Sequence, residues 1–179
     1  WHYPLENEAK FKANFPADFI AEGVDQTRGW FFTLHVLGVM LFDSVAYKNV
    51  MSNGLLLDAK GQKMSKRLGN VVDPFETIAK YGADGTRWYM MRNSDPWDNL
   101  KFDVNTLADV SRAHFGTIYN TYSFFALYAN IDNWKPSESK GLETVEIDAW
   151  IISKLNTLIL EVTKYYEEYE PTKAARAIE

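Results

Sequence analysis

Two apolar segments in the first third of the chain are typical of β-strands, and a long apolar helix is expected between them. Residues 18–23 predict a short buried strand that ends at a glycine, and residues 26–42 are almost continuously apolar, as in a helix packed on several sides. Residues 50–57 predict a second strand, interrupted at Gly54. Two strands that bracket one helix predict a parallel βαβ unit, because parallel strands need a crossover connection. The expected fold class is therefore α/β.

Turn and cap signals follow the second strand. Residues 58–61 predict a turn in which Gly61 adopts a positive φ. Asp73 directly precedes a proline and is an N-cap candidate, and Gly82 is placed to end the helix that begins there. A second short helix is expected to start near Asp84.

The second half of the chain predicts long helices, with a domain boundary near residue 100. Residues 105–130 are rich in aromatic side chains, and one helical face carries Ile118, Tyr122, Phe125 and Ala129. We interpret these aromatics as core and not as a platform for base stacking. Residues 132–140 predict a polar loop, and residues 151–169 predict a further amphipathic helix.

Composition narrows the class of protein. At 179 residues and 46% hydrophobic content the chain can bury a real core, so it is expected to be globular. Its net charge of −5 argues against a small, globally basic nucleic-acid-binding domain, so any nucleic-acid contact is expected to be local. Without cysteine and with three scattered histidines, no zinc site, other metal site or tightly bound cofactor is expected.

No apolar run approaches the ~20 residues that span a bilayer, so no membrane association is expected and a cytoplasmic location is compatible. The chain begins with neither a methionine nor a signal peptide, which suggests a piece of something longer.

A cationic loop is the most informative local feature. Residues 58–68 hold four cations and one anion in a chain that is negative overall. Lysines on a glycine-flanked loop can reach a polyphosphate and screen the charge of a pyrophosphate leaving group, while Ser65 and backbone amides add hydrogen bonds. The alternative is a solvated surface loop, which most lysine-rich runs are.

The order of residues in this loop resembles a known signature. Residues 63–67 read KMSKR, similar to the KMSKS motif of class I aminoacyl-tRNA synthetases, and residues 69–74 continue as that family does. Arg67 departs from the final serine but keeps the loop cationic. The resemblance implies that the loop closes over ATP while the amino-acid carboxylate attacks the α-phosphate. It implies catalytic phosphate contacts by Lys63 and Lys66, with Ser65 in the ATP site.

A second segment supports the same family. Residues 21–31 resemble the aminoacyl-adenylate-binding segment of its isoleucine-specific members. A carboxylate and a glycine at the carboxyl end of a strand lie where open α/β sheets bind ligands. The resemblance implies that Trp30 walls the isoleucine pocket and that the adenylate is contacted by Glu22, Gly23, Asp25 and Gln26.

Three residues of this segment also have a structural interpretation. Asp25 could be only an N-cap for the following helix, and Trp30 could be only core. For Arg28 a structural ion pair is favoured. Residues 52–54 resemble the family's segment near the adenine, where Gly54 would permit close approach to ATP.

The resemblance extends over the whole chain. It implies that residues 1–15 return from an editing insertion, that residues 16–97 are the second half of a Rossmann-type catalytic domain, and that residues 98–179 begin a helical anticodon-binding domain. The implied reaction activates isoleucine with ATP and Mg²⁺ and transfers it to tRNA(Ile).

The implied partners are isoleucine, ATP, tRNA(Ile) and the rest of the synthetase chain. No HIGH-like motif is present, so this segment alone is expected to be inactive. The alternatives are a valine-specific member of the family and a noncatalytic tRNA-binding module.

Overall fold

A computed structural model describes residues 2–135 and 145–179. It divides into two compact units, one formed by Trp1–Leu57 with Pro96–Leu100 and the other by Asp58–Asp95 with Lys101–Glu179. The segment Asp58–Asp95 therefore groups with the later helices. Most of the loop expected over residues 132–140 lies outside the described residues.

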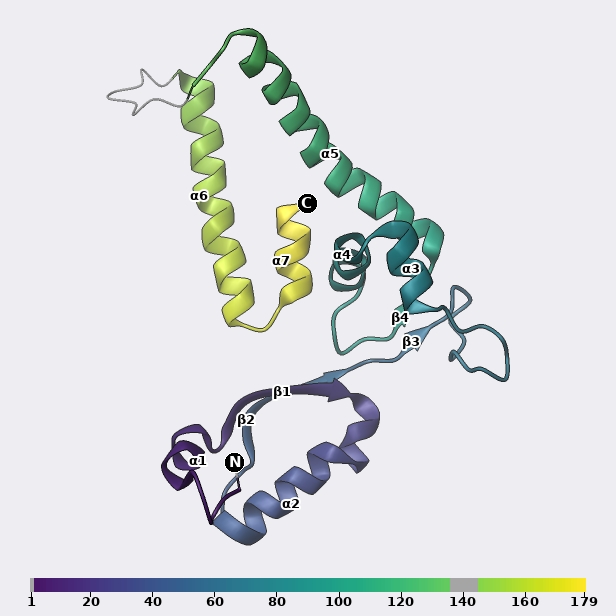
Figure 1. Ribbon diagram of the computed structural model, residues 1–179, viewed down its shortest axis with the longest axis vertical. Coiled ribbons are helices and arrows are strands. Elements are labelled where there is room, and N and C mark those ends of the chain that lie inside the picture. The colour runs from purple at the N-terminus through teal and green to yellow at the C-terminus, as the bar shows by residue number, and fades with distance from the viewer. Residues whose placement is uncertain (1, 136–144) are drawn as a thin grey trace. The chain divides into compact units, whose positions relative to one another are not determined.

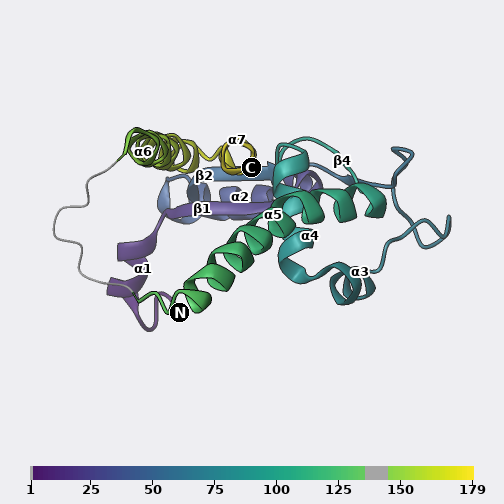
Figure 2. The same ribbon diagram turned by 90° about the horizontal axis from the view of Figure 1, so that it is seen from above.

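The first unit is built on a βαβ arrangement (Figures 1 and 2). Its elements are α1 (Glu8–Asn14), β1 (Ala17–Gly23), the 3₁₀ helix η1 (Val24–Arg28), α2 (Trp30–Phe42) and β2 (Tyr47–Asn53). The two strands pair in parallel, with Ile20 opposite Val50 and Glu22 opposite Ser52. The predicted parallel βαβ unit is confirmed.

The core of this unit is small. Ile20 on β1 is buried, with 8% of its surface exposed, and Phe31 on α2 is 4% exposed. At the other end of α2, Phe42 contacts Phe11 and Phe15, with ring centroids 5.2 and 4.7 Å away. These aromatic contacts attach α1 to the helix.

The expected burial of the first strand and of α2 was wrong for much of both elements. Within β1 only Ile20 is buried, and on α2 the side chains of Met40 and Leu41 are 76% and 67% exposed. The sequence pattern correctly reports apolar surface on all sides. Two strands and one helix, however, cover only one face of each element in the described residues.

The second unit is helical apart from its first loop. It contains α3 (Pro74–Tyr81), α4 (Ala83–Asn93), α5 (Val104–Ile131), α6 (Glu146–Glu167) and α7 (Pro171–Ile178). Asp73 caps α3 by accepting from the amides of Phe75 and Glu76 at 2.7 and 3.1 Å, and Gly82 ends α3 with φ 81°. Both predicted signals are confirmed. A separate short sheet, all of whose residues except Lys101 belong to the first unit, pairs β3 (Leu56–Leu57) with β4 (Leu100–Lys101).

Tyr89 on α4 lies at the centre of the helical unit. It is fully buried, and its ring meets Phe102 edge-on with centroids 5.4 Å apart. Its hydroxyl donates to the carbonyl of Lys101 at 2.9 Å and accepts from the amide of Asp103 at 3.2 Å. Burial raises the pKa of this phenol, so it stays a neutral donor that joins α4 to the start of α5.

Helix α7 closes the same core by covering the carboxyl end of α4. The buried Thr172 hydroxyl lies 2.7 Å from the carbonyl oxygen of Met91 and 2.9 Å from that of Ser94. Arg176 donates to the carbonyl of Arg92 at 3.0 Å. These contacts satisfy helix-terminal carbonyls that would otherwise lack intrahelical donors.

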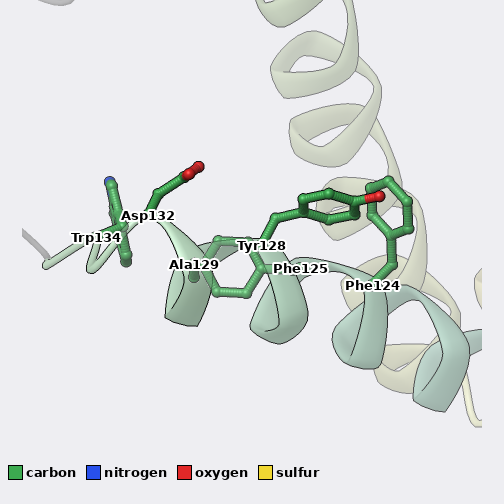
Figure 3. Close-up of a pocket in the computed structure, with 6 residues that line it drawn as sticks. All are labelled: Phe124, Phe125, Tyr128, Ala129, Asp132 and Trp134. Atoms are coloured by element: carbon green, nitrogen blue, oxygen red, sulfur yellow. The ribbon is translucent and has the colours of Figure 1, made fainter.

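The aromatic stretch of α5 is exposed, so the interpretation of these side chains as core was wrong for this structure. Leu107 and Val110 in its first turns are buried, whereas the large apolar side chains from Ile118 to Ile131 are half exposed or more. Figure 3 shows a hollow near the end of α5, lined by Phe124, Phe125, Tyr128, Ala129, Asp132 and Trp134. Farther along α5, the ring of His114 stacks on Trp88 of α4 with centroids 4.1 Å apart.

No described helix is long and apolar enough to cross a membrane.

Candidate functional site

The cationic loop is organised by Asp58 at its start. One carboxylate oxygen of Asp58 accepts from the amides of Lys60 and Gln62 at 3.0 and 2.7 Å, and the Asp58 amide donates to the carbonyl of Gln62 at 2.8 Å. Gly61 has φ 80°, as predicted for this turn. The hydrogen bonds from Asn70 and from the Gln62 amide hold the pKa of Asp58 below its ordinary value. Asp58 is therefore an ionised anchor at neutral pH.

Asn70 fixes the other end of the loop. Its side-chain nitrogen donates to the second Asp58 oxygen at 2.9 Å and to the carbonyl of Lys63 at 3.3 Å, and its side-chain oxygen accepts from the Ser65 amide at 2.9 Å. The sequence alone predicted neither Asp58 nor Asn70 as an anchor of the loop. Short polar side chains at the two ends of a glycine-containing loop were the available signal.

The cations of the loop project from this frame. Lys63, Lys66 and Arg67 are exposed, and no ion pair within residues 2–135 and 145–179 involves any of them. Ser65 is partly engaged, because its amide bonds to Asn70 and its hydroxyl oxygen accepts from the Leu68 amide at 3.2 Å. The Ser65 amide is therefore used within the loop, while the three cations and the Ser65 hydroxyl can still donate to a phosphate. Unpaired cations on an anchored loop suit a polyanionic ligand.

Glu22 and Gly23 lie at the carboxyl end of β1, as predicted. Glu22 is exposed and lies opposite Ser52 in the parallel register. The Ser52 hydroxyl oxygen is buried and has no hydrogen-bond partner in the described residues. A Cβ on Gly23 would lie 2.7 Å from a carboxylate oxygen of Asp25, so the glycine leaves room for that side chain.

Gln26 is used structurally at the start of α2. Its side-chain oxygen accepts from the Trp30 amide at 2.9 Å, and its side-chain nitrogen donates to Asp25 at 3.2 Å. A Cβ on Gly29 would lie 2.7 Å from that same oxygen. The N-cap interpretation of Asp25 was therefore wrong, because Gln26 supplies the acceptor for the orphan amide.

The structural interpretations of the two neighbouring residues also fail in this structure. Trp30 is 44% exposed, so it is not core. In the described part of the chain Arg28 takes part in no ion pair. Exposed side chains at 22, 25 and 30 leave this segment accessible to a ligand.

Gly54 is required by the chain's own backbone. A Cβ there would lie 2.1 Å from the carbonyl oxygen of Asp98. The Gly54 amide donates to the carbonyl of Pro96 at 2.8 Å, and the Leu55 amide donates to the side chain of Asn99 at 2.7 Å. The predicted close approach is present, but its partner is the segment Pro96–Leu100, so contact with ATP is not needed to explain the glycine.

The candidate residues fall in both compact units, with positions 22–54 in the first and positions 63–66 in the second. Among the described residues no group of three or more metal-ligating side chains gathers.

Comparison with known proteins identifies the family. The model of tRNA synthetases class I (I, L, M and V) matches residues 1–103, which is more than half of the chain. The chain belongs to the class I tRNA synthetases. The resemblance seen in residues 21–31 and 63–67 is thereby confirmed at the level of the family.

Curated relatives of this synthetase chain are isoleucine–tRNA ligases. That of Cytophaga hutchinsonii is 61% identical over 181 residues, covering 100% of this chain and 16% of the relative. That of Bacteroides fragilis is 63% identical over 99% of the chain, again 16% of the relative, and that of Thermus thermophilus is 50% identical over 99% of the chain and 17% of the relative. The chain thus spans about one sixth of the length of the relatives it matches.

Solved synthetases share the fold. Mycobacterium tuberculosis methionyl-tRNA synthetase in complex with methionyl-adenylate matches with a TM-score of 0.81 at 19% identity, covering 98% of this chain and 34% of that one. The Agrobacterium radiobacter leucyl enzyme, in a ternary complex with tRNA and LeuAMS, matches with a TM-score of 0.69 at 21% identity, covering 90% and 21%. The mixed α/β class predicted for the chain is confirmed.

Proposed function

We propose that this chain is the part of an isoleucine–tRNA ligase that carries the KMSKS-type loop and the adenylate-binding segment. The observation that carries the proposal is identity of 61–63% with isoleucine–tRNA ligases over 99–100% of the chain. In the intact enzyme the reaction is ATP-dependent activation of isoleucine, with Mg²⁺ accompanying ATP, followed by transfer to tRNA(Ile).

The loop geometry supports a role in activation. A carboxylate oxygen of isoleucine attacks the α-phosphorus of ATP, a new bond forms between them, and the bond from that phosphorus to the bridging oxygen breaks. The electron pair leaves on pyrophosphate. Lys63 and Lys66, exposed and unpaired in the described residues, are placed on a loop that can neutralise this developing charge, with Ser65 as a further donor.

The first unit supplies the substrate side of the proposal. Glu22 offers an exposed carboxylate for the isoleucine ammonium or a ribose hydroxyl, and Trp30 offers an exposed aromatic wall for the side chain. Asp25 and Gln26 retain hydrogen-bonding capacity beyond their mutual contact and the bond from the Trp30 amide to Gln26, and Gly23 allows close approach. Gly54 is proposed only to shape the backbone near this segment.

The remaining assignments extend the proposal. Residues 1–15 are proposed to return from the editing insertion, residues 16–97 to complete the Rossmann-type domain, and residues 98–179 to begin the anticodon-binding domain. The rest of the synthetase chain, ATP and tRNA(Ile) are the partners, and the location is cytoplasmic. The segment alone is proposed to be inactive.

Calorimetric titration tests the amino-acid assignment. A full-length ligase containing this segment is titrated with nonhydrolysable isoleucyl-adenylate and valyl-adenylate analogues, and a Glu22→Ala variant is compared. The expected result is tighter binding of the isoleucyl analogue, weakened in the variant. Preference for the valyl analogue would instead assign the chain to the valine-specific enzymes.

A further inference from the structure

The side chains of Asp58 and Asn70 together form a closed hydrogen-bonded frame around the cationic loop, which we name the Asp58–Asn70 clamp. Asp58 takes the amides of Lys60 and Gln62 with one oxygen and the Asn70 amide group with the other. The side-chain oxygen of Asn70 accepts a hydrogen bond from the Ser65 amide, and its side-chain nitrogen donates to Asp58 and to the Lys63 carbonyl. Every strong acceptor and donor of the pair is thus directed at the loop backbone or at its partner.

The clamp grips the lysine motif itself. Asn70 donates to the carbonyl of Lys63 at 3.3 Å and accepts from the amide of Ser65 at 2.9 Å, so it fixes the backbone on both sides of Met64. The Ser65 hydroxyl and carbonyl then hold the amide of Leu68 at 3.2 and 3.1 Å. The backbone from Lys63 to Leu68 is therefore shaped before any ligand binds.

Such shaping matters because an unfixed loop loses conformational freedom when it closes on a ligand. Ordering a residue costs conformational entropy, and a loop that is already ordered does not lose this binding free energy at the transition state. The ammonium groups sit at the ends of long flexible side chains, so their reach depends on where the backbone places them. A displacement of about 1 Å can lower a rate by about 10²-fold.

We propose that Asp58 and Asn70 are positioning residues for the activation step, which hold the backbone of residues 63–68 so that Lys63 and Lys66 reach the leaving pyrophosphate. Neither side chain touches the substrate in this account. The inference rests on the proposed function, and it assigns to the clamp an effect on the rate of activation and not on isoleucine binding.

Isosteric replacements separate this role from general destabilisation. Asn70→Asp keeps the acceptor for Ser65 but loses both donors and places a second carboxylate against Asp58. Asp58→Asn keeps an acceptor for Lys60 and Gln62 but turns an amide group toward the amide group of Asn70. In the double swap, Asp58→Asn with Asn70→Asp, the new amide group at position 58 again faces a carboxylate oxygen at position 70. Only the Lys63 carbonyl is then left without its donor.

The test is isoleucine-dependent pyrophosphate exchange in a full-length ligase containing this segment. Each single variant is expected to lower kcat by about 10–10²-fold with the KM for isoleucine unchanged, and the swap is expected to recover part of the loss. Asp103→Asn is the matched control. The Asp103 carboxylate also accepts a hydrogen bond from a backbone amide, that of Asn105 at 2.9 Å, but Asp103 lies outside the loop. It is expected to keep the wild-type kcat.

The inference is overturned if the single variants keep the wild-type kcat, or if the swap performs no better than they do. A loss caused by unfolding would appear as a lower melting temperature without recovery in the swap, and also overturns it. Lys66→Ala in the same assay distinguishes failure of the proposed function from failure of the clamp proposal. If Lys66→Ala retains full exchange the proposed function fails, whereas if it loses exchange while the clamp variants do not, only the clamp is rejected.

Discussion

The loop at residues 58–70 and the segment at residues 22–30 are both exposed, but they are held in different ways. In the loop, anchoring and chemistry belong to different residues, since Asp58 and Asn70 make the hydrogen bonds and the lysines stay unpaired in the described structure. In the segment, Gln26 both caps α2 and is a candidate ligand contact. Mutations of the loop lysines are therefore expected to change activity without changing stability. Mutation of Gln26 in the segment is expected to change both stability and ligand binding.

The largest effect is expected from Lys66→Ala in a full-length ligase. Loss of one positively charged donor to the leaving group is expected to reduce isoleucine-dependent pyrophosphate exchange by about 10²–10³-fold. The melting temperature should stay the same, because the side chain is exposed and no described ion pair holds it. Steady-state exchange and thermal unfolding of the same preparation measure both. A lower melting temperature together with the loss of exchange would show that Lys66 also supports the fold of the loop.

Gly54→Ala tests the first unit through its backbone. The new methyl group would lie 2.1 Å from the carbonyl oxygen of Asp98, so the segment Pro96–Leu100 must move. We expect a loss of about 1–3 kcal/mol in the free energy of unfolding, measured by urea denaturation.

Gly116→Ala is the matched control, because its Cβ would meet only Arg112 at 3.9 Å within α5. It is expected to stabilise the protein by about 0.5–1 kcal/mol. Equal effects of the two replacements would contradict the close backbone approach at Gly54.

Gln26→Ala and Glu22→Ala sharpen the comparison inside the adenylate-like segment. Removing the Gln26 acceptor leaves the Trp30 amide at the start of α2 without a partner, which should cost about 0.5–2 kcal/mol of stability. Glu22→Ala should leave stability unchanged, because the side chain is exposed. Both variants should weaken binding of the adenylate analogue. If Gln26→Ala unfolds no more easily than Glu22→Ala, the capping role is wrong.

The smallest effect is expected from pH acting on Asp58. The pKa of this carboxyl is lowered by the hydrogen bonds from Asn70 and the Gln62 amide, so the folded loop favours the ionised form. Its contribution to stability is present above the ordinary aspartate pKa and is lost as pH falls through the lowered one. Carboxyl chemical shifts should report a titration below the ordinary range. In Asn70→Ala that titration should move upward, and an unchanged midpoint would contradict the clamp.

Local signals in the sequence were sufficient for the elements that surround both regions. The Asp73 cap, the Gly61 and Gly82 turns and the parallel strand pair depend on neighbouring residues or on an obligatory crossover, and all were predicted correctly. The cationic loop and its family signature were also evident from residue order.

Contacts between residues far apart in the sequence could not be predicted. Asn70 meets Asp58 across 12 positions, and Gly54 meets Asp98 across 44, so no local pattern reveals either pair. The exposure of the aromatic side chains on α5 was not predicted for another reason. A hydrophobic pattern shows that a side chain is suited to burial, but it does not show whether another element covers it.

The central claim is that this segment serves isoleucine activation through the lysines of its loop. The most direct test is pyrophosphate exchange by a full-length ligase containing the segment, measured with isoleucine, valine, leucine and methionine, for the wild type and for a Lys63→Ala, Lys66→Ala double variant. The account predicts the highest kcat/KM with isoleucine and loss of that exchange in the double variant at unchanged melting temperature. Faster exchange with another amino acid, or exchange that survives loss of both lysines, would contradict it.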